Sequence, residues 1–147
     1  MDRLSSLMVR ASLVWLLLGV VIGGLMLNDA LLPGQWVAWF VPTHAHMLFV
    51  GWFLQFVLAI AFWLLPRKRS EAAPQGYNER VAAVAAAALN LGLLLRVAAE
   101  PATRAGSGGG WTTVFLAASA LLQVGAAVYF AGSLWPRTAA RAPRKTG

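Results

Sequence analysis

Two histidines stand out chemically, because they lie at the start of a long apolar segment. His44 and His46 are the only two histidines in the chain, and the mostly apolar run that follows them extends to Leu65. An imidazole is costly to place in lipid, so it usually has a partner or a task there. It can ligate a metal or simply hydrogen-bond at the wet membrane interface. The two residues alone favour neither interpretation over the other.

The spacing of the two histidines indicates what kind of ligand they could hold. Positions two apart on a regular helix point about 200° away from each other. We therefore do not expect His44 and His46 to bind one metal ion together. A copper-handling site that also uses Met47 is a weaker alternative for the same reason.

The helical faces of the two histidines differ. His44 shares its face with Gly51 and Gln55, and the missing side chain of Gly51 predicts a groove that admits the flat edge of a porphyrin. The face of His46 is uniformly apolar and indicates plain packing. We therefore favour His44 as an axial ligand of haem iron, and we keep His46 as a possible second ligand.

A cation at matching membrane depth is the second indication of a site. Arg96 lies at the end of the third apolar segment, and Arg104 follows in the next loop. A guanidinium can bind a haem propionate through two parallel hydrogen bonds. The simpler alternative is an ion pair of Arg96 with Glu100, four residues further along the same helix.

Other familiar chemistry is missing from the sequence. The chain has no Cys, which removes disulfides, thiolate metal sites and covalent haem attachment. It contains no Walker loop, no GxSxG and no HExxH motif. We do not expect a proton-relay transporter either, because no acidic residue lies in the middle of an apolar segment; the acids are Asp2, Asp29, Glu71, Glu79 and Glu100.

The elements that would position these residues are four apolar segments. Hydrophobic residues make up 59% of the chain and charged residues 12%. Each apolar segment is long enough to cross a hydrocarbon core of about 30 Å as a helix. The sequence predicts an all-α membrane protein, a four-transmembrane-helix bundle in residues 1–136. The expected spans are 7–28, 43–65, 81–99 and 112–135, with Pro42 at the start of the second helix.

The basic residues predict the orientation. The net charge is +7, but Lys and Arg lie in short loops and in the tail, which is typical of topology signals and not of nucleic-acid binding. The N-terminus, the second loop and the tail hold all but two of the 12 Lys and Arg: Arg3, Arg10, Arg67, Lys68, Arg69, Arg80, Arg137, Arg141, Arg144 and Lys145. We therefore expect both termini in the cytoplasm, a plasma (inner) membrane location, the histidines near the outer face, and a basic disordered tail at 137–147.

The residues around His44 also resemble a known family. They look like the helix of subunit I of the haem–copper oxidase superfamily that carries a low-spin haem ligand, especially in C-type cytochrome c oxidases and nitric oxide reductases. The chain also resembles short four-helix relatives of that subunit over most of its length. The residues that carry the resemblance are Pro42 to Trp52, Gln55, Trp63 to Arg67, Asn90 to Arg96 and Ala99 to Pro101.

The resemblance implies that His44 is the axial ligand of a b-type haem near the outer face. The family's full subunit I is a much longer chain with several further His ligands. With only two His, this chain cannot alone build a bis-His haem together with a binuclear centre. We therefore expect electron transfer or binding of a small gas such as O2 or NO, and we leave open whether the protein is an oxidoreductase.

Two consequences for partners follow. One axial ligand per chain and four short helices favour a homo-oligomer in the lipid bilayer that encloses the haem jointly, with an electron donor or respiratory subunits as further partners. The alternative is a cofactor-free accessory or assembly subunit of a respiratory complex, in which the small residues of the helices, such as Gly19 and Gly23, would be partner surfaces.

Overall fold

The computed structural model describes residues 1–28, 31, 34–67, 71 and 74–138, and all regular elements in these residues are helices. Four helical segments are long and apolar enough to cross a membrane, which indicates a multi-pass membrane protein. The elements are α1 (Arg3–Met26), α2 (Gly34–His46), η1 (Met47–Leu54), α3 (Gln55–Leu64), α4 (Glu79–Arg104), α5 (Gly110–Leu134) and η2 (Trp135–Arg137). Most of the predicted tail, residues 139–147, lies outside the described residues.

The second span begins earlier than the sequence indicated. Helix α2 starts at Gly34, so Pro42 lies inside the helix and not at its start. Aromatic side chains spaced three and four residues apart pack along this extra part of the helix: Trp36 contacts Trp39 with 5.5 Å between ring centroids, and it stacks on Phe40 at 6.1 Å. Such contacts stabilise a helix, and aromatic residues are common where a span meets the membrane interface.

The middle of the second span is a π-helix. Elements α2, η1 and α3 run on without a break, and η1 begins directly after His46. Five of the buried residues of this span recur at every fourth position, namely Thr43, Met47, Gly51, Gln55 and Ala59, and Phe62 is buried three residues further on. In an α-helix a step of four residues turns the face by about 40°. The wider turn of a π-helix reduces that drift and keeps this row of residues on one side.

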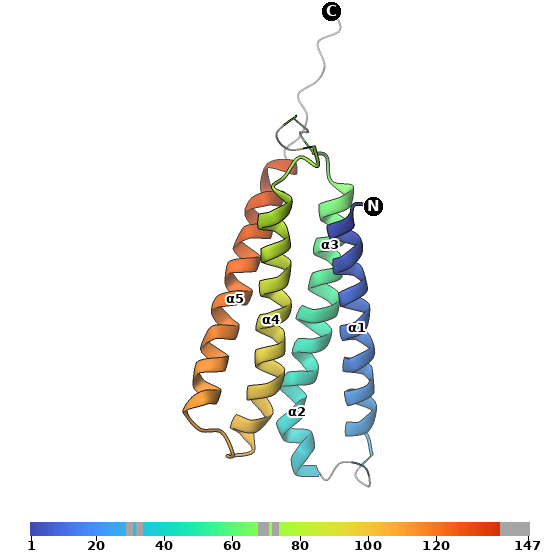
Figure 1. Ribbon diagram of the computed structural model, residues 1–147. Helices are drawn as coiled ribbons and strands as arrows, with labels where there is room; N and C mark the ends of the chain where they lie inside the picture. The colour runs from blue at the N-terminus through green and yellow to red at the C-terminus, as the bar shows by residue number, and fades with distance from the viewer. Residues whose placement is uncertain (29–30, 32–33, 68–70, 72–73, 139–147) are drawn as a thin grey trace, which may run out of the picture.

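The helices form an open row. Figure 1 shows α5, α4, the second span and α1 in this order across the view. Helix α5 packs mainly on α4, helix α1 packs on the second span, and within the described residues the backbones of α1 and α5 do not approach each other closely. The start of α1, the loop before α4 and the end of α5 lie at the same end of the molecule, which we call the terminal end.

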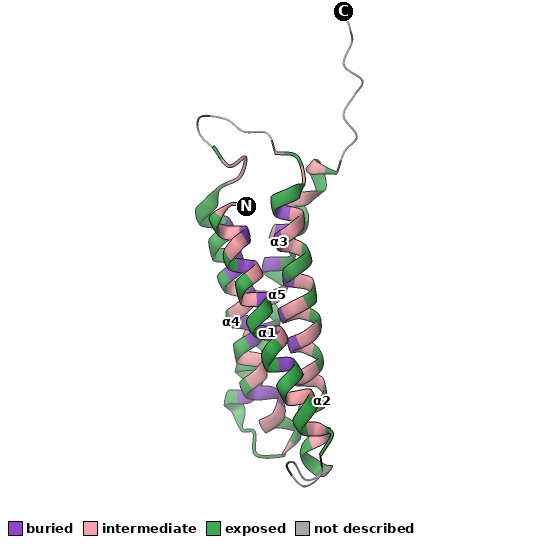
Figure 2. Ribbon diagram, turned by 90° about the vertical axis from the view of Figure 1, so that its right-hand side faces the viewer, coloured by how far each residue is buried: buried purple, intermediate pink, exposed green. Residues whose placement is uncertain are grey.

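Two apolar clusters hold this row together. At the terminal end all four spans contribute to a buried cluster that includes Met8, Phe62, Ala82 and Phe130. Nearer the opposite end, Trp15 of α1 packs with Met47 and Leu93. Figure 2 shows the buried residues on the inner faces of the helices and exposed residues along their outer faces. These exposed outer faces are rich in Leu, Val and Phe, as expected for helices that face lipid.

Two polar contacts cross between helices inside the apolar layer. The Trp15 Nε1 group donates a hydrogen bond of 2.9 Å to Asn90 Oδ1, which links α1 to α4. The Gln55 Nε2 group donates a hydrogen bond of 3.0 Å to the Met8 carbonyl, which links α3 to α1. Such bonds satisfy polar groups that would otherwise be unpaired in hydrocarbon.

An ion pair and an aromatic ring close the terminal end. Arg67 Nη2 lies 2.7 Å from Asp2 Oδ2. Burial by itself would raise the pKa of Asp2, but hydrogen bonds from Ser5 and Arg67 and the charge of Arg67 outweigh it, so this pKa lies below its usual 3.8. Burial and the nearby Asp2 charge raise the pKa of Tyr77 to about 12.

A substitution at Gly51 tests the close packing of the second span. An added Cβ at Gly51 would lie 2.6 Å from Trp15 Cγ and 2.7 Å from Leu93 Cδ2. We expect Gly51→Ala to destabilise the protein by about 1–3 kcal/mol through overpacking, measured as thermal unfolding in detergent. Gly125→Ala is the matched control, because nothing lies within 4 Å of its added Cβ. Equal stability of the two variants would contradict this packing.

A titration tests the contact of Tyr77 with Asp2. The chain has two tyrosines, so Tyr129→Phe leaves Tyr77 as the only one. The ultraviolet absorbance of its phenolate should rise with a midpoint of about 12. In the same background Asp2→Asn should lower the midpoint, because a negative neighbour no longer opposes ionisation. A midpoint near 10 that Asp2→Asn leaves unchanged would contradict the contact.

Candidate functional site

His44 packs directly against α1. Its Nδ1 atom lies 2.9 Å from the Gly19 carbonyl oxygen of α1. An added Cβ at Gly23 would lie 2.7 Å from His44 Cε1, and one at Gly19 would lie 2.6 Å from Leu48. Gly23 therefore leaves room for the imidazole, because a side chain at this position would displace the ring, and Gly19 leaves room for Leu48.

The contact with Gly19 determines how His44 can act. A backbone carbonyl only accepts hydrogen bonds, so the 2.9 Å contact places a proton on Nδ1 of His44. In the neutral ring the other nitrogen, Nε2, then carries the lone pair. Metal-ligating histidines usually donate their second N–H to a carbonyl or carboxylate in this way, which fixes the ring and raises its basicity. In this tautomer Nε2 of His44 is the nitrogen that could act as a ligand.

The prediction of a groove beside Gly51 is wrong for the single chain. The side chains of Trp15 and Leu93 fill the space beside Gly51, and Gln55 is fully buried with its amide on the Met8 carbonyl. Because η1 is a π-helix, the regular spacing used to place Gly51 and Gln55 on the face of His44 does not hold here. Both residues join the row of Thr43 and Met47 instead.

His46 points to a different neighbour. Its Nδ1 atom lies 2.7 Å from the Pro42 carbonyl oxygen and 3.7 Å from Glu100 Oε2 on α4. His44 meets α1 and His46 approaches α4, so the two imidazoles face different helices, as their spacing predicted. The Pro42 carbonyl also places the proton of His46 on Nδ1.

Glu100 gathers the polar groups at this end of α4. The Glu100 side chain is 10% exposed. It lies 3.5 Å from Arg96 Nη2 and accepts a hydrogen bond of 3.3 Å from Thr43 Oγ1. The ion pair expected between Arg96 and Glu100 is therefore present. The Nε atom of Arg96 is buried and has no hydrogen-bond partner among the described residues. We call Thr43, His46, Arg96 and Glu100 the Glu100 cluster.

The structure does not join either arginine to His44. Arg96 belongs to the Glu100 cluster, whereas His44 is held by α1. Arg104 is exposed in the last turn of α4. Within the described ranges, no three His, Asp or Glu residues group as the ligands of a metal ion. A role of Arg96 or Arg104 toward a haem propionate remains a prediction.

The sequence alone did not reveal two features of this site. The spacing of Gly19 and Gly23 indicated helix packing, but nothing in it showed that His44 would be the residue packed there. For Glu100 only an ion pair with Arg96 was considered, whereas Thr43 and His46 also approach the same carboxylate. The aromatic run before Pro42 could have indicated the longer α2 helix, but it does not indicate which side chains lie beside Glu100.

Comparison with known proteins gives no relative. No family model, no curated protein and no solved structure matches the chain. The resemblance to subunit I of the haem–copper oxidases stays a prediction.

Removing the Glu100 carboxylate tests the Glu100 cluster. Glu100→Ala leaves the Arg96 guanidinium without an anion, and we expect a loss of about 2 kcal/mol in the free energy of unfolding. Glu79→Ala is the control on the same helix, where the side chain is exposed, and should cost about 0.5 kcal/mol.

The double variant Arg96→Ala/Glu100→Ala should regain part of this loss, because it leaves no unpaired charge. Chemical unfolding of the wild type and these three variants in detergent measures these effects. A Glu100→Ala variant as stable as Glu79→Ala would contradict the cluster.

Proposed function

We propose that this chain is an integral membrane protein that binds haem b with His44 as an axial ligand, for electron transfer or for binding a small gas such as O2 or NO. The observation that carries this proposal is the contact between His44 Nδ1 and the Gly19 carbonyl. It leaves Nε2 as the basic nitrogen that a haem iron requires. The likeness of residues 42–52 to a haem-ligand helix supports the same assignment.

The bound haem would supply reversible one-electron chemistry or an open coordination position for a gas. The chain's own residues hold and orient the ligand. The Gly19 carbonyl keeps the proton on Nδ1 and prevents rotation of the imidazole. Gly23 leaves the ring its space beside α1. An axial ligand fixed on two sides in this way changes its position little when the iron changes its charge.

Enclosure of the macrocycle is assigned to a second copy of the chain. The described residues of one chain leave no groove beside Gly51, and the row of helices leaves most of α5 exposed. A homo-oligomer would cover such faces and surround the haem jointly. In this arrangement His46 is the candidate second ligand, because the proton on its Nδ1 leaves the lone pair of the neutral ring on Nε2. Arg96 and Arg104 are the candidate propionate partners.

The proposed orientation places the terminal end in the cytoplasm and His44 near the outer face of the plasma (inner) membrane. The basic residues of the terminal end support this, since cytoplasmic loops carry an excess of Lys and Arg. An electron donor or respiratory subunits would then approach from either surface.

A cofactor-free accessory subunit of a respiratory complex is the second candidate. One observation favours it: the space at Gly51 is filled from both sides by Trp15 and Leu93, so the helices are well packed without any ligand. This alternative gives a protein free of iron that co-purifies with larger respiratory subunits.

The absorption spectrum of the purified protein distinguishes the two candidates. We expect a Soret band in the wild type and its loss in His44→Ala. His46→Ala is the matched control and should keep haem, with a change to five-coordinate iron where His46 is the second ligand. An iron-free wild type, or a spectrum that His44→Ala leaves unaltered, would contradict haem binding by His44.

A pair of neighbouring glycines tests how the ligand is positioned. Gly23→Ala pushes a methyl group against the ring of His44, whereas nothing lies within 4 Å of an added Cβ at Gly24. We expect Gly23→Ala to bind haem about tenfold more weakly, a cost of about 1.4 kcal/mol for a displaced ligand. Gly24→Ala should bind as the wild type does. Equal haem affinity of both variants in a haem titration would contradict the role of Gly23.

A further inference from the structure

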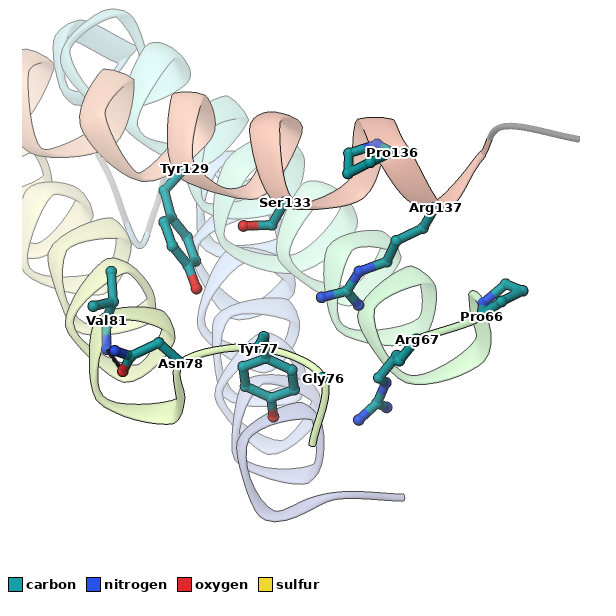
Figure 3. A pocket seen from close by; sticks show the side chains of 10 residues that line it. All are labelled: Pro66, Arg67, Gly76, Tyr77, Asn78, Val81, Tyr129, Ser133, Pro136 and Arg137. Carbon is teal, nitrogen blue, oxygen red and sulfur yellow. Dashed lines mark hydrogen bonds between the residues drawn. The ribbon is translucent and has the colours of Figure 1, made fainter. Parts of the chain in front are cut away.

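A cavity at the terminal end has a chemistry that the proposed haem site does not use. It measures about 530 Å³, and we call it the basic pocket. Figure 3 shows its walls, which come from the end of the second span, the loop before α4, the start of α4 and the end of α5. The lining residues are Pro66, Arg67, Gly76, Tyr77, Asn78, Val81, Tyr129, Ser133, Pro136 and Arg137.

Two guanidinium groups flank one aromatic ring in this pocket. Arg67 Cζ lies 5.5 Å from the centre of the Tyr77 ring, and Arg137 Cζ lies 5.8 Å from it. The two like charges that approach this ring repel each other, and an anion near both would offset the repulsion. The ring attracts the cations through its face, but it carries no net charge to neutralise them.

The two arginines differ in how well they are paired. Arg67 Nη2 holds the Asp2 carboxylate at 2.7 Å and also donates to the Trp63 carbonyl at 3.1 Å. Arg137 has no carboxylate partner among the described residues, and its one hydrogen bond there is a long one of 3.4 Å to the Phe62 carbonyl. Its guanidinium packs over the Phe62 ring at 4.3 Å. Arg137 is therefore a half-buried cation with no carboxylate in direct contact in the described part of the chain.

Hydroxyl groups add neutral donors beside Arg137. Figure 3 shows the Ser133 and Tyr129 side chains on the same wall of the pocket, with the Arg137 guanidinium between Ser133 and Tyr77. The Asn78 side chain is already engaged, because it accepts hydrogen bonds from the Arg80 and Val81 backbone N–H groups. Guanidinium and hydroxyl donors together suit the several acceptor oxygens of a phosphate group.

The position of the pocket along the helices indicates which molecule could supply such a phosphate group. The pocket lies at the ends of three apolar helices, where the Trp63 and Trp135 side chains are exposed. Exposed Trp at span ends marks the head-group layer. Pro66, Val81 and Pro136 give the pocket apolar walls beside the charged groups. Basic pockets between transmembrane helices at this depth fit anionic lipid head groups.

We propose that the basic pocket binds the phosphate of an anionic phospholipid head group, with Arg137 as the principal contact and Arg67, Ser133 and Tyr129 as supporting donors. The lipid supplies the anion that Arg137 lacks. Its acyl chains lie along the apolar outer faces of α4 and α5. This site is independent of haem, and it is at the end of the molecule opposite His44.

Native mass spectrometry of the purified full chain in detergent tests the proposal. Added phosphatidylglycerol should remain bound at one molecule per chain and raise the thermal unfolding midpoint, whereas phosphatidylcholine should do neither. Arg137→Gln should bind phosphatidylglycerol about tenfold more weakly, the cost of one charge-assisted contact. Arg80→Gln is the matched control, because Arg80 is exposed on α4 near the same end and does not line the pocket.

The outcomes separate the sources of the anion. Equal retention of both lipids, or full retention of phosphatidylglycerol in Arg137→Gln, would overturn the proposal. If inorganic phosphate stabilised the protein as much as phosphatidylglycerol does, the lipid would be ruled out as the ligand and a soluble phosphate would take its place. If Arg137→Gln does not fold, Tyr129→Phe removes only a hydroxyl and should still weaken lipid retention. Unchanged retention in that variant would then count against the site.

Discussion

The close approach of α1 to the second span is the constraint on which the candidate site depends. Gly19 and Gly23 let the two backbones come near enough for a carbonyl of α1 to hold the His44 ring. Small residues allow such approaches between membrane helices. Here the approach also decides which nitrogen of the imidazole keeps its lone pair. Helix packing and the tautomer of His44 are therefore coupled.

The π-helix extends this constraint along the second span. It keeps Thr43, Met47, Gly51 and Gln55 on one buried side, so the span meets both α1 and α4 without a change of face. His44 and His46, which flank this row, then reach different neighbours. The polar groups at one end of the span are thus divided between the Gly19 carbonyl and the Glu100 carboxylate. Short π-helical segments inside longer helices are frequent at functional sites.

The sequence predicted the helices better than the site. Long apolar runs between Pro and Gly residues were enough to place four helices, because length and hydropathy determine a span. The start of α2 was missed, since Pro42 was expected to begin the helix and lies inside it. Gly51 was wrongly expected to open a groove, because a regular helical spacing cannot anticipate a π-helix. Arg67 and Arg137 indicated topology, and only the fold brings them to one ring.

The protonation state of His44 tests the central claim most directly, because it requires no haem. Nitrogen NMR of the 15N-histidine-labelled protein in detergent, assigned with His46→Gln, reports which ring nitrogen carries the proton. At a pH where the ring is neutral, we predict the tautomer with the proton on Nδ1 and the lone pair on Nε2, and the loss of this preference in Gly23→Ala. A neutral ring with its proton on Nε2 in the wild type would contradict the assignment of His44 as a ligand.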